Sequence, residues 1–197
     1  MSVAFFIDAP VHAFILKAEG ASWEKSSLHL IVRAVSHYGD WPELMLLGVI
    51  GVFMARYFKN MRWQRIFLIA MIASTLAGGL TNTLRLTTGR TRPRASPAIE
   101  QGWYGSYHEG SCLIGKSEYN SFPSGHTATA VGFATVVFFA SPLWGLIAIS
   151  LAMTIASSRL LLGAHHPSDL MAAAMLAIGV AWFCWKYFNQ KKWQWLS

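Results

Sequence analysis

Long apolar runs, separated by short basic or polar breaks, constrain the fold of this chain more than any other feature. Five runs lie at about residues 42–58, 66–84, 125–140, 143–157 and 169–187. A helix needs about 20 mostly apolar residues to cross the hydrocarbon core of a bilayer. Only 13% of the residues are charged, whereas an average soluble domain has about 25%. We therefore predict an all-α fold, an integral membrane bundle of five to six transmembrane helices, in a single domain over residues 1–197.

Residues 1–40 are apolar only in patches. Two sets of apolar residues follow the i, i+3, i+4, i+7 spacing of a helix: Val11, Phe14, Ile15 and Ala18, and Leu28, Ile31, Val32 and Val35. Neither segment offers a full apolar span, so we predict amphipathic helices that lie in the membrane interface. A short, tilted span at one of them remains an alternative. The chain begins without a basic region or a clear cleavage site, so we expect no removable signal peptide.

Basic residues at the ends of the apolar runs predict how the bundle is oriented. They form the first connector and the C-terminal tail: Arg56, Lys59, Arg62 and Arg65, and Lys186, Lys191 and Lys192. The positive-inside rule places both groups in the cytoplasm. The loop at residues 85–122 and the two later polar breaks then face the periplasm or the exterior of a bacterial inner membrane. With a net charge of +7 placed this way, we expect membrane lipids and phosphate as partners, and no nucleic acid.

The first outward break is rich in arginine. Four arginines fall within ten residues: Arg85, Arg90, Arg92 and Arg94. Arginine holds phosphate oxygens through paired, charge-assisted hydrogen bonds, so this group suits a phosphate pocket. A basic belt at the membrane interface is the alternative. Pro93 ends any helix at this point and turns the chain away after Arg92.

The second break is the turn Ser124-Gly125-His126, directly before an apolar run. Ser124 is a good cap for a helix that begins there. The first N–H groups of a helix have no partners within it and favour an anion. His126 would lie at the edge of that anion, where it can donate a proton near neutral pH. An ordinary turn explains the same residues.

The third break contains Ser158, Arg159 and the pair His165-His166, followed by Pro167 and Asp169. A carboxylate one helical turn after His165 can accept its ring N–H and leave the other nitrogen as a nucleophile. His166 would then be a surface or supporting residue. A zinc site of His126, His165, His166 and Asp169 is an alternative, but adjacent histidines rarely face one site and nearby arginines repel a cation. We expect no metal and no other cofactor.

The two cysteines carry little information. Cys112 lies in a polar loop and Cys184 in an apolar run, so we expect them at different depths and predict no disulfide bond between them.

Together the three breaks resemble the signature of the type 2 phosphatidic acid phosphatase superfamily. The family pattern is Lys, six residues, Arg-Pro; then Pro-Ser-Gly-His; then Ser-Arg, five residues, His, three residues, Asp. The chain matches every spacing, from Arg85 and Arg92-Pro93 through Pro123–His126 to Ser158-Arg159, His165 and Asp169. Arg85 stands where the family has lysine, and a guanidinium is larger and binds oxygens in pairs.

This resemblance implies a metal-independent phosphatase. His165 would attack phosphorus and form a phosphohistidine, Asp169 would orient it, and His126 would protonate the leaving oxygen. The phosphate oxygens would be held by Arg85, Arg92, Ser124, Gly125 and Arg159. Many bacterial members of the family have six spans, one more than the apolar runs predict here.

A phosphate site at the outer membrane surface suits a lipid substrate. The candidates are undecaprenyl pyrophosphate, phosphatidylglycerol phosphate, phosphatidic acid and lipid A 1-phosphate. Alternatives are a lipid-to-lipid phosphotransferase of the same fold, a non-catalytic lipid-phosphate binder or transporter, and a vanadate-dependent oxidase. The loop at residues 95–120 would either cap the pocket or form an interfacial aromatic belt, through Trp103, Tyr104, Tyr107 and His108.

Overall fold

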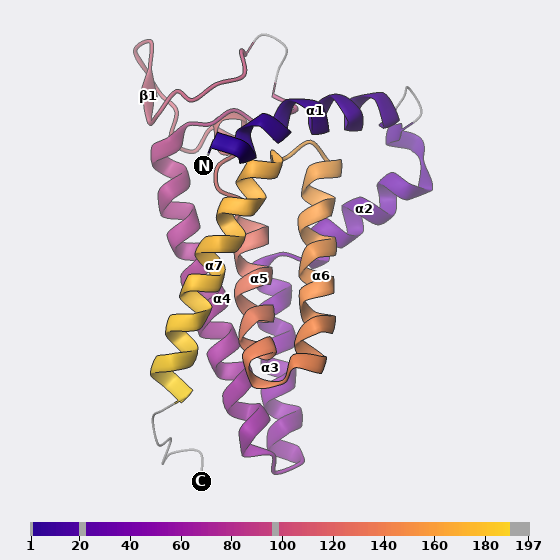
Figure 1. Cartoon of the computed structure of the whole chain (residues 1–197), viewed down its shortest axis with the longest axis vertical. Coiled ribbons are helices and arrows are strands. Elements are labelled where there is room, and N and C mark those ends of the chain that lie inside the picture. The colour runs from indigo at the N-terminus through magenta and orange to yellow at the C-terminus, as the bar shows by residue number, and fades with distance from the viewer. Residues whose placement is uncertain (1, 20–22, 96–98, 190–197) are drawn as a thin grey trace.

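The computed structural model describes residues 2–19, 23–95 and 99–189 and is almost entirely helical. Its long helices are α1 (Ser2–Glu19), α2 (Ser27–Tyr38), α3 (Trp41–Tyr57), α4 (Met61–Thr88), α5 (Gly125–Ala140), α6 (Pro142–Leu161) and α7 (Pro167–Asn189). Two short 3₁₀ turns, η1 (Trp23–Lys25) and η2 (Ser117–Tyr119), and a two-stranded antiparallel hairpin of β1 (Tyr107–His108) and β2 (Ser111–Cys112) complete the described elements. Figure 1 shows α3 to α7 running side by side along the long axis.

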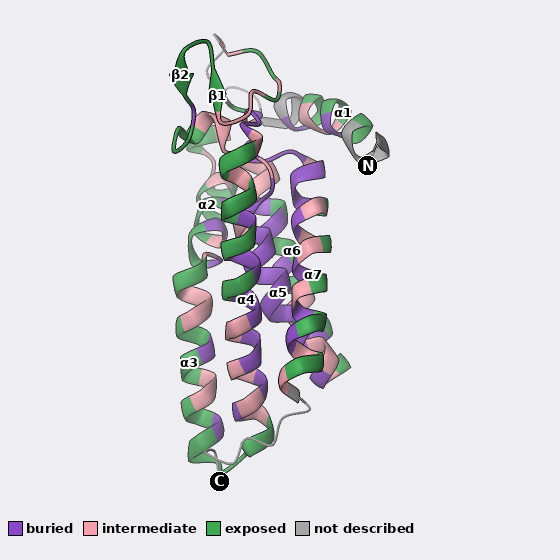
Figure 2. Ribbon diagram, turned by 90° about the vertical axis from the view of Figure 1, so that its left-hand side faces the viewer, coloured by how far each residue is buried: buried purple, intermediate pink, exposed green. Residues whose placement is uncertain are grey.

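Helix α5 is the centre of the bundle. Most of its side chains are buried, and it packs against α4, α6 and α7 (Figure 2). The core on either side of it is rich in alanine: Ala70, Ala73 and Ala77 on α4, Ala128, Ala130 and Ala134 on α5, and Ala173, Ala177 and Ala181 on α7. Small side chains let helices approach closely, which is how helices associate within a membrane. A helix that is apolar on all sides is expected where it is surrounded by other helices or by lipid.

The prediction of a membrane helical bundle is confirmed. Within the described residues, three helices are long and apolar enough to cross a bilayer: Met61–Thr88, Pro142–Leu161 and Pro167–Phe188. Helix α5 is apolar but has 16 residues, and α3 has 17. Large apolar side chains on the outside of the bundle, such as Phe53, Leu151 and Phe183, are exposed, as expected for a surface that contacts lipid. The number of spans stays a prediction.

The N-terminal helices cover the end of the bundle at which α4 ends and α5 and α7 begin (Figure 1). Helix α1 lies across that end and contacts α7, and α2 returns along α6. On α1, Phe14 is 72% exposed while Ile15 and Asp8 are buried; the side chain of Ala18 lies outside the described residues. On α2, Leu28 and Ile31 are exposed while Val32 is buried. Both helices therefore have one face against protein and one away from it.

The loop between α4 and α5 folds over the same end. Trp103 pairs with Arg90 in an isolated β-bridge, and its ring lies 5.0 Å from that of Phe122. The guanidinium of Arg90 lies 4.8 Å from the centre of the Trp103 ring. Trp103 therefore contacts Arg90 and Phe122 with one side of its ring, while the residue remains 48% exposed. Cys112 is exposed in the hairpin and Cys184 is buried in α7; both are free, as predicted.

Candidate active site

The structure brings the three polar breaks together at one end of the bundle. Arg85 lies in the last turn of α4, His126 at the start of α5, Arg159 in the last turn of α6, and His165 just before α7. The backbone N–H of Ser124 donates to the carbonyl of Asp169 over 3.3 Å, which joins the second break directly to the third. The charges of these groups are close enough to act on one another, including Arg159 on His126 and His165.

Helix α5 begins where the sequence predicts, with Ser124 in the N-cap position. The predicted hydroxyl cap is wrong, because Ser124 makes no side-chain cap bond and its Oγ instead accepts from the hydroxyl of Thr127 over 3.0 Å. Gly125 leaves space for the side chain of Arg85. A Cβ at this position would lie 2.6 Å from Nη2 of Arg85, so any side chain would displace that guanidinium. The turn thus allows an arginine to approach a helix N-terminus.

Three arginines keep donors available in the site. Among the described residues, the Nε atoms of Arg85, Arg92 and Arg159 are buried without a hydrogen-bond partner. Each buried N–H without a partner costs about 1–3 kcal/mol, so the site is prepared for an acceptor that is absent from the protein itself. Burial lowers the pKa of Arg92, and the charge of Asp169 opposes that shift. Three mutually repelling guanidinium groups with open donors suit an anion with several oxygens.

His165 is 2% exposed, and its ring is oriented by a backbone group that the sequence does not reveal. Nδ1 lies 2.6 Å from the carbonyl oxygen of Ser121 and 3.7 Å from Oδ2 of Asp169. A carbonyl only accepts, so Nδ1 carries the proton and donates to Ser121. Asp169 lies farther from this proton but within ion-pair distance, and its role in orienting His165 stays a prediction. Nε2 is then the unprotonated ring nitrogen, and its role as the nucleophile stays a prediction.

Asp169 is fully buried and organises the groups around His165. Its Oδ2 accepts from the hydroxyl of Ser121 over 2.5 Å and from the backbone N–H of His166 over 2.8 Å. Its Oδ1 accepts from Nη1 of Arg90. Asp169 thus positions Ser121, and the carbonyl of Ser121 in turn accepts the hydrogen bond of His165. Neither Ser121 nor Arg90 was predicted to have a role, although Arg90 belongs to the arginine cluster.

His166 is buried, which excludes the prediction of a surface residue and favours a supporting one. Its Nε2 lies 3.2 Å from the carbonyl of Thr91, and its ring lies 6.4 Å from that of His12 on α1. Burial is the largest cause that lowers its pKa, followed by the charge of Arg90. The ring of His166 therefore contacts the loop through Thr91 and lies next to α1. Within the described ranges, no three His, Cys, Asp or Glu side chains are grouped so as to hold a metal ion.

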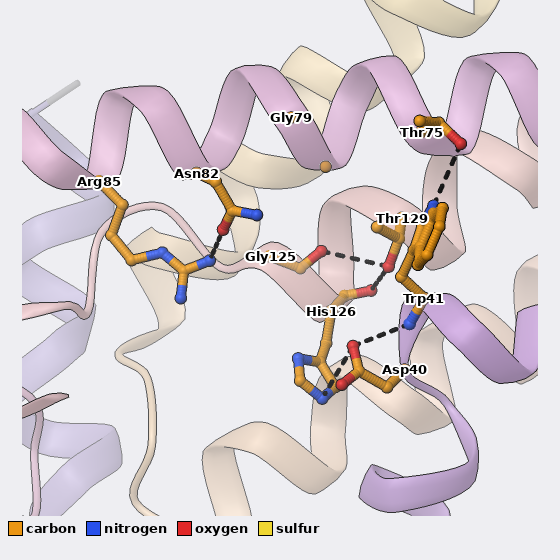
Figure 3. A pocket seen from close by; sticks show the side chains of 10 residues that line it. Asp40, Trp41, Thr75, Gly79, Asn82, Arg85, Gly125, His126 and Thr129 are labelled. Atoms are coloured by element: carbon orange, nitrogen blue, oxygen red, sulfur yellow. Dashed lines mark hydrogen bonds and ion pairs between the residues drawn. The ribbon is translucent and has the colours of Figure 1, made fainter. Parts of the chain in front are cut away.

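A pocket of about 440 Å³ opens beside His126, between α3, α4 and the start of α5. Figure 3 shows Arg85 and Asn82 projecting from α4 toward the space that His126 faces. Nε2 of His126 lies 3.5 Å from Oδ1 of Asp40, a residue to which the sequence assigns no role. Asp40 also caps α3, accepting from the N–H of Trp41 over 2.8 Å. The pocket continues along the small residues Gly78 and Gly79 toward the outside of α4.

Burial also sets the protonation of His165. The pKa of this histidine is lowered to about 4: burial is the largest cause, Asp169 opposes it, and the charges of Arg159 and Arg92 add to it. His165 is therefore neutral at physiological pH. The site thus contains a neutral imidazole with a fixed tautomer, a second histidine, and the three arginines Arg85, Arg92 and Arg159, which we call the arginine cradle. These are the groups needed for attack on a bound phosphate.

Comparison with known proteins agrees with this chemistry. A family model described as the PAP2 superfamily matches residues 63–193. The lipid A 1-phosphatase of Rhizobium johnstonii is 28% identical over 187 residues, covering 89% of this chain and 70% of that protein. The crystal structure of Aquifex aeolicus LpxE has a TM-score of 0.62 at 20% identity, covering 91% of this chain and 95% of that one. A transmembrane PAP2-type phosphatidylglycerolphosphate phosphatase from Bacillus subtilis has a TM-score of 0.56 at 19% identity, covering 96% and 99%. The family model matches well over half of the sequence, and the chain belongs to the PAP2 superfamily.

Proposed function

We propose that this membrane lipid phosphatase hydrolyses a lipid phosphate or pyrophosphate through a phosphohistidine at His165 and releases phosphate on the extracytoplasmic side of the bacterial inner membrane. Its membership of the PAP2 superfamily and its lipid A 1-phosphatase relative establish the general activity. One observation carries the mechanism: Arg92 and Arg159, with open, buried Nε donors, act on a neutral histidine whose Nδ1 proton is fixed by Ser121, and Arg85, with the same open donor, lines the pocket of His126.

In the first step, the lone pair on Nε2 of His165 forms a bond to phosphorus while the bond to the lipid oxygen breaks. Protonated His126 gives its proton to that oxygen, and the lipid leaves as an alcohol or, from a pyrophosphate, as a monophosphate. Arg85, Arg92 and Arg159 hold the non-bridging oxygens and stabilise the charge in the transition state, with the hydroxyl of Ser124 and the N–H of Gly125. The phosphorylated ring is positively charged, and the Ser121 carbonyl and Asp169 stabilise it.

In the second step, a water attacks phosphorus and the P–N bond breaks. His126, now neutral, accepts the proton of the water, and both histidines return to their starting states. Burial and the charge of Arg159 disfavour the protonated ring that each new cycle requires, and the carboxylate of Asp40, 3.5 Å from Nε2, opposes them. No step needs a metal, because the arginines supply the positive charge.

The position of the pocket supports a lipid leaving group. It contains His126 but not His165, so it lies on the side of the phosphate from which the lipid oxygen departs. Thr75 and Gly79 also line an apolar groove between α4 and α7, which leads from the pocket to the lipid-facing surface. Lipid A 1-phosphate is the leading substrate because a relative hydrolyses it. Phosphatidylglycerol phosphate, phosphatidic acid and undecaprenyl pyrophosphate are the competitors.

We expect the purified protein in detergent to release phosphate from at least one of these four lipids in the presence of EDTA. Vanadate, which resembles a phosphate in its transition-state geometry, should inhibit the reaction by occupying the arginine cradle. The measurement is phosphate release over the four-lipid panel, with His165→Ala protein as the background control. Release that depends on an added acceptor lipid would favour a phosphotransferase, and activity abolished by EDTA would contradict the metal-free mechanism.

We also expect an unusually low acid limit for turnover. Attack requires neutral His165, and a lowered pKa extends the neutral form to lower pH. Activity limited by this group should therefore persist below the ordinary histidine pKa of 6.5 and disappear as the pH falls through about 4. The test is kcat at saturating substrate between pH 3.5 and 8, with recovery at neutral pH to exclude denaturation. A loss centred near 6.5 would show that His165 is not buried as described.

A further inference from the structure

Asp8 is a buried carboxylate on a helix that is otherwise largely at the surface. It is 7% exposed, whereas Phe6 and Phe14 on the same helix are 78% and 72% exposed. Oδ1 of Asp8 accepts from the backbone N–H of Ser168 over 2.9 Å, and Oδ2 accepts from the Ser168 hydroxyl over 2.6 Å. Oδ2 also accepts from Nη2 of Arg90 over 2.6 Å. A buried charge is retained only where it is paired and hydrogen-bonded, and Asp8 is both.

The side chain of Asp8 caps the N-terminus of α7 through the N–H of Ser168, although the two residues are 160 positions apart in the chain. Ser168 is the second residue of α7, where backbone N–H groups have no partner inside the helix. A carboxylate at a helix N-terminus is also favoured by the helix dipole. Asp8 therefore fixes Ser168 at the start of α7, and Ser168 lies three residues after His165 and one before Asp169.

Arg90 connects Asp8 to the centre of the site. Its Nη2 binds Asp8, while its Nη1 donates to Oδ1 of Asp169 and, over 2.6 Å, to the hydroxyl of Ser168. The guanidinium packs against the ring of Trp103, 4.8 Å from its centre, and the ring of Phe122 lies 6.0 Å away. A planar guanidinium can contact two carboxylates through two separate nitrogens in a fixed geometry, which the single ammonium of a lysine does not reproduce.

We propose that Asp8 and Arg90 are positioning residues for His165. Through them, the packing of α1 on the end of the bundle keeps the nucleophile in the orientation needed for attack. The inference rests on the proposed role of His165. The path runs from Asp8 through Arg90 to Asp169, from Asp169 to the hydroxyl of Ser121, and from the Ser121 carbonyl to Nδ1 of His165. Asp8 and Arg90 are outside the pocket that faces the lipid, so their loss should change the rate of phosphoryl transfer more than substrate binding.

The test compares Asp8→Ala, Asp8→Asn and Arg90→Lys with Phe14→Ala in the full-length protein, using the best substrate of the lipid panel. A misplacement of about 1 Å at a reacting group costs up to about 100-fold, so we expect kcat of Asp8→Ala to fall about 10- to 100-fold. KM and the inhibition constant for vanadate should stay close to the wild-type values, because the arginine cradle is intact. Asp8→Asn keeps an acceptor for Ser168 but loses the charge, so its kcat should lie between that of Asp8→Ala and that of the wild type. Phe14→Ala changes the exposed face of the same helix and should retain the wild-type kcat.

Residues that act through one path should not have additive effects. The double variant Asp8→Ala/Arg90→Lys is expected to be little worse than the worse single variant. Wild-type kcat in Asp8→Ala and Arg90→Lys would overturn the proposal, and so would equal losses in kcat and vanadate binding, which indicate general disruption of the fold. These outcomes leave the proposed function intact. A wild-type enzyme whose phosphoryl intermediate forms on a residue other than His165 would overturn the proposed function instead, and with it this role for Asp8.

Discussion

Replacement of His165 by alanine is expected to abolish phosphate release from the lipid substrate. In enzymes with a covalent intermediate, loss of the nucleophile can reduce kcat by about 10⁶-fold, which places the variant below detection. His126→Ala removes the proton donor and is expected to lose about 10²- to 10⁴-fold, the usual contribution of general acid–base catalysis. The measurement is phosphate release by each purified variant, with folding monitored by circular dichroism and detergent gel filtration.

His166→Ala is the matched control for His165→Ala. The two histidines are adjacent and both buried, but the ring of His166 contacts the carbonyl of Thr91 and lies near His12. Its loss removes support from the loop and from α1, so we expect weaker activity that is still easily measured. Full activity in His165→Ala would reject this residue as the nucleophile. Equal loss in both variants would indicate that packing, not nucleophilicity, explains the effect.

Removal of one of the arginines Arg92 and Arg159 should also produce a large loss of activity. Arg92→Ala and Arg159→Ala each take away a donor aimed at the phosphate, and a single preorganised donor to a transition-state anion is worth about 10²- to 10³-fold in kcat. The vanadate inhibition constant should rise in both variants, because vanadate occupies the same donors. Substitution by lysine should recover only part of the activity, because lysine cannot bind two oxygens in a fixed, planar geometry.

Arg62→Ala serves as the control for these variants. Arg62 lies at the opposite end of α4 from Arg85 and donates to the carbonyl of Ala140 over 2.7 Å. Its removal changes the net charge by the same amount without touching the site. Cradle variants that behave like Arg62→Ala in both kcat and vanadate inhibition would contradict the role of the arginines.

The helices and most of the candidate site could be predicted because both depend on local sequence. Apolar runs predict α4 to α7, since a membrane helix must be apolar where it meets lipid or a packed core. The apolar runs that predict α4 and α6 end at residues 84 and 157, but the helices continue to Thr88 and Leu161. The added turns contain Arg85 and Arg159, at the polar end of the bundle. His165 and Asp169 could be chosen because one helical turn separates them, and the motif spacing identified the arginines.

The missed residues make contacts between distant parts of the chain. The carbonyl of Ser121 has no signature in a side-chain pattern, although it orients His165. Asp8 interrupts the apolar pattern of α1 and looks like a solvated charge, and Asp40 looks like a helix cap, which it also is. The bonds from Asp8 to Arg90 and Ser168 span 82 and 160 positions. Only the packing of α1 and α3 against the end of the bundle gives these carboxylates their partners.

The most direct test of the account is to identify the phosphorylated atom during turnover. The enzyme would be mixed with its lipid substrate, quenched in alkali to preserve acid-labile phosphohistidine, and analysed by mass spectrometry and ³¹P NMR. With Nδ1 of His165 bonded to the Ser121 carbonyl, the predicted product is phosphate on Nε2 of His165. Phosphate on Nδ1, on His126 or on no protein residue during active turnover would contradict the proposed mechanism.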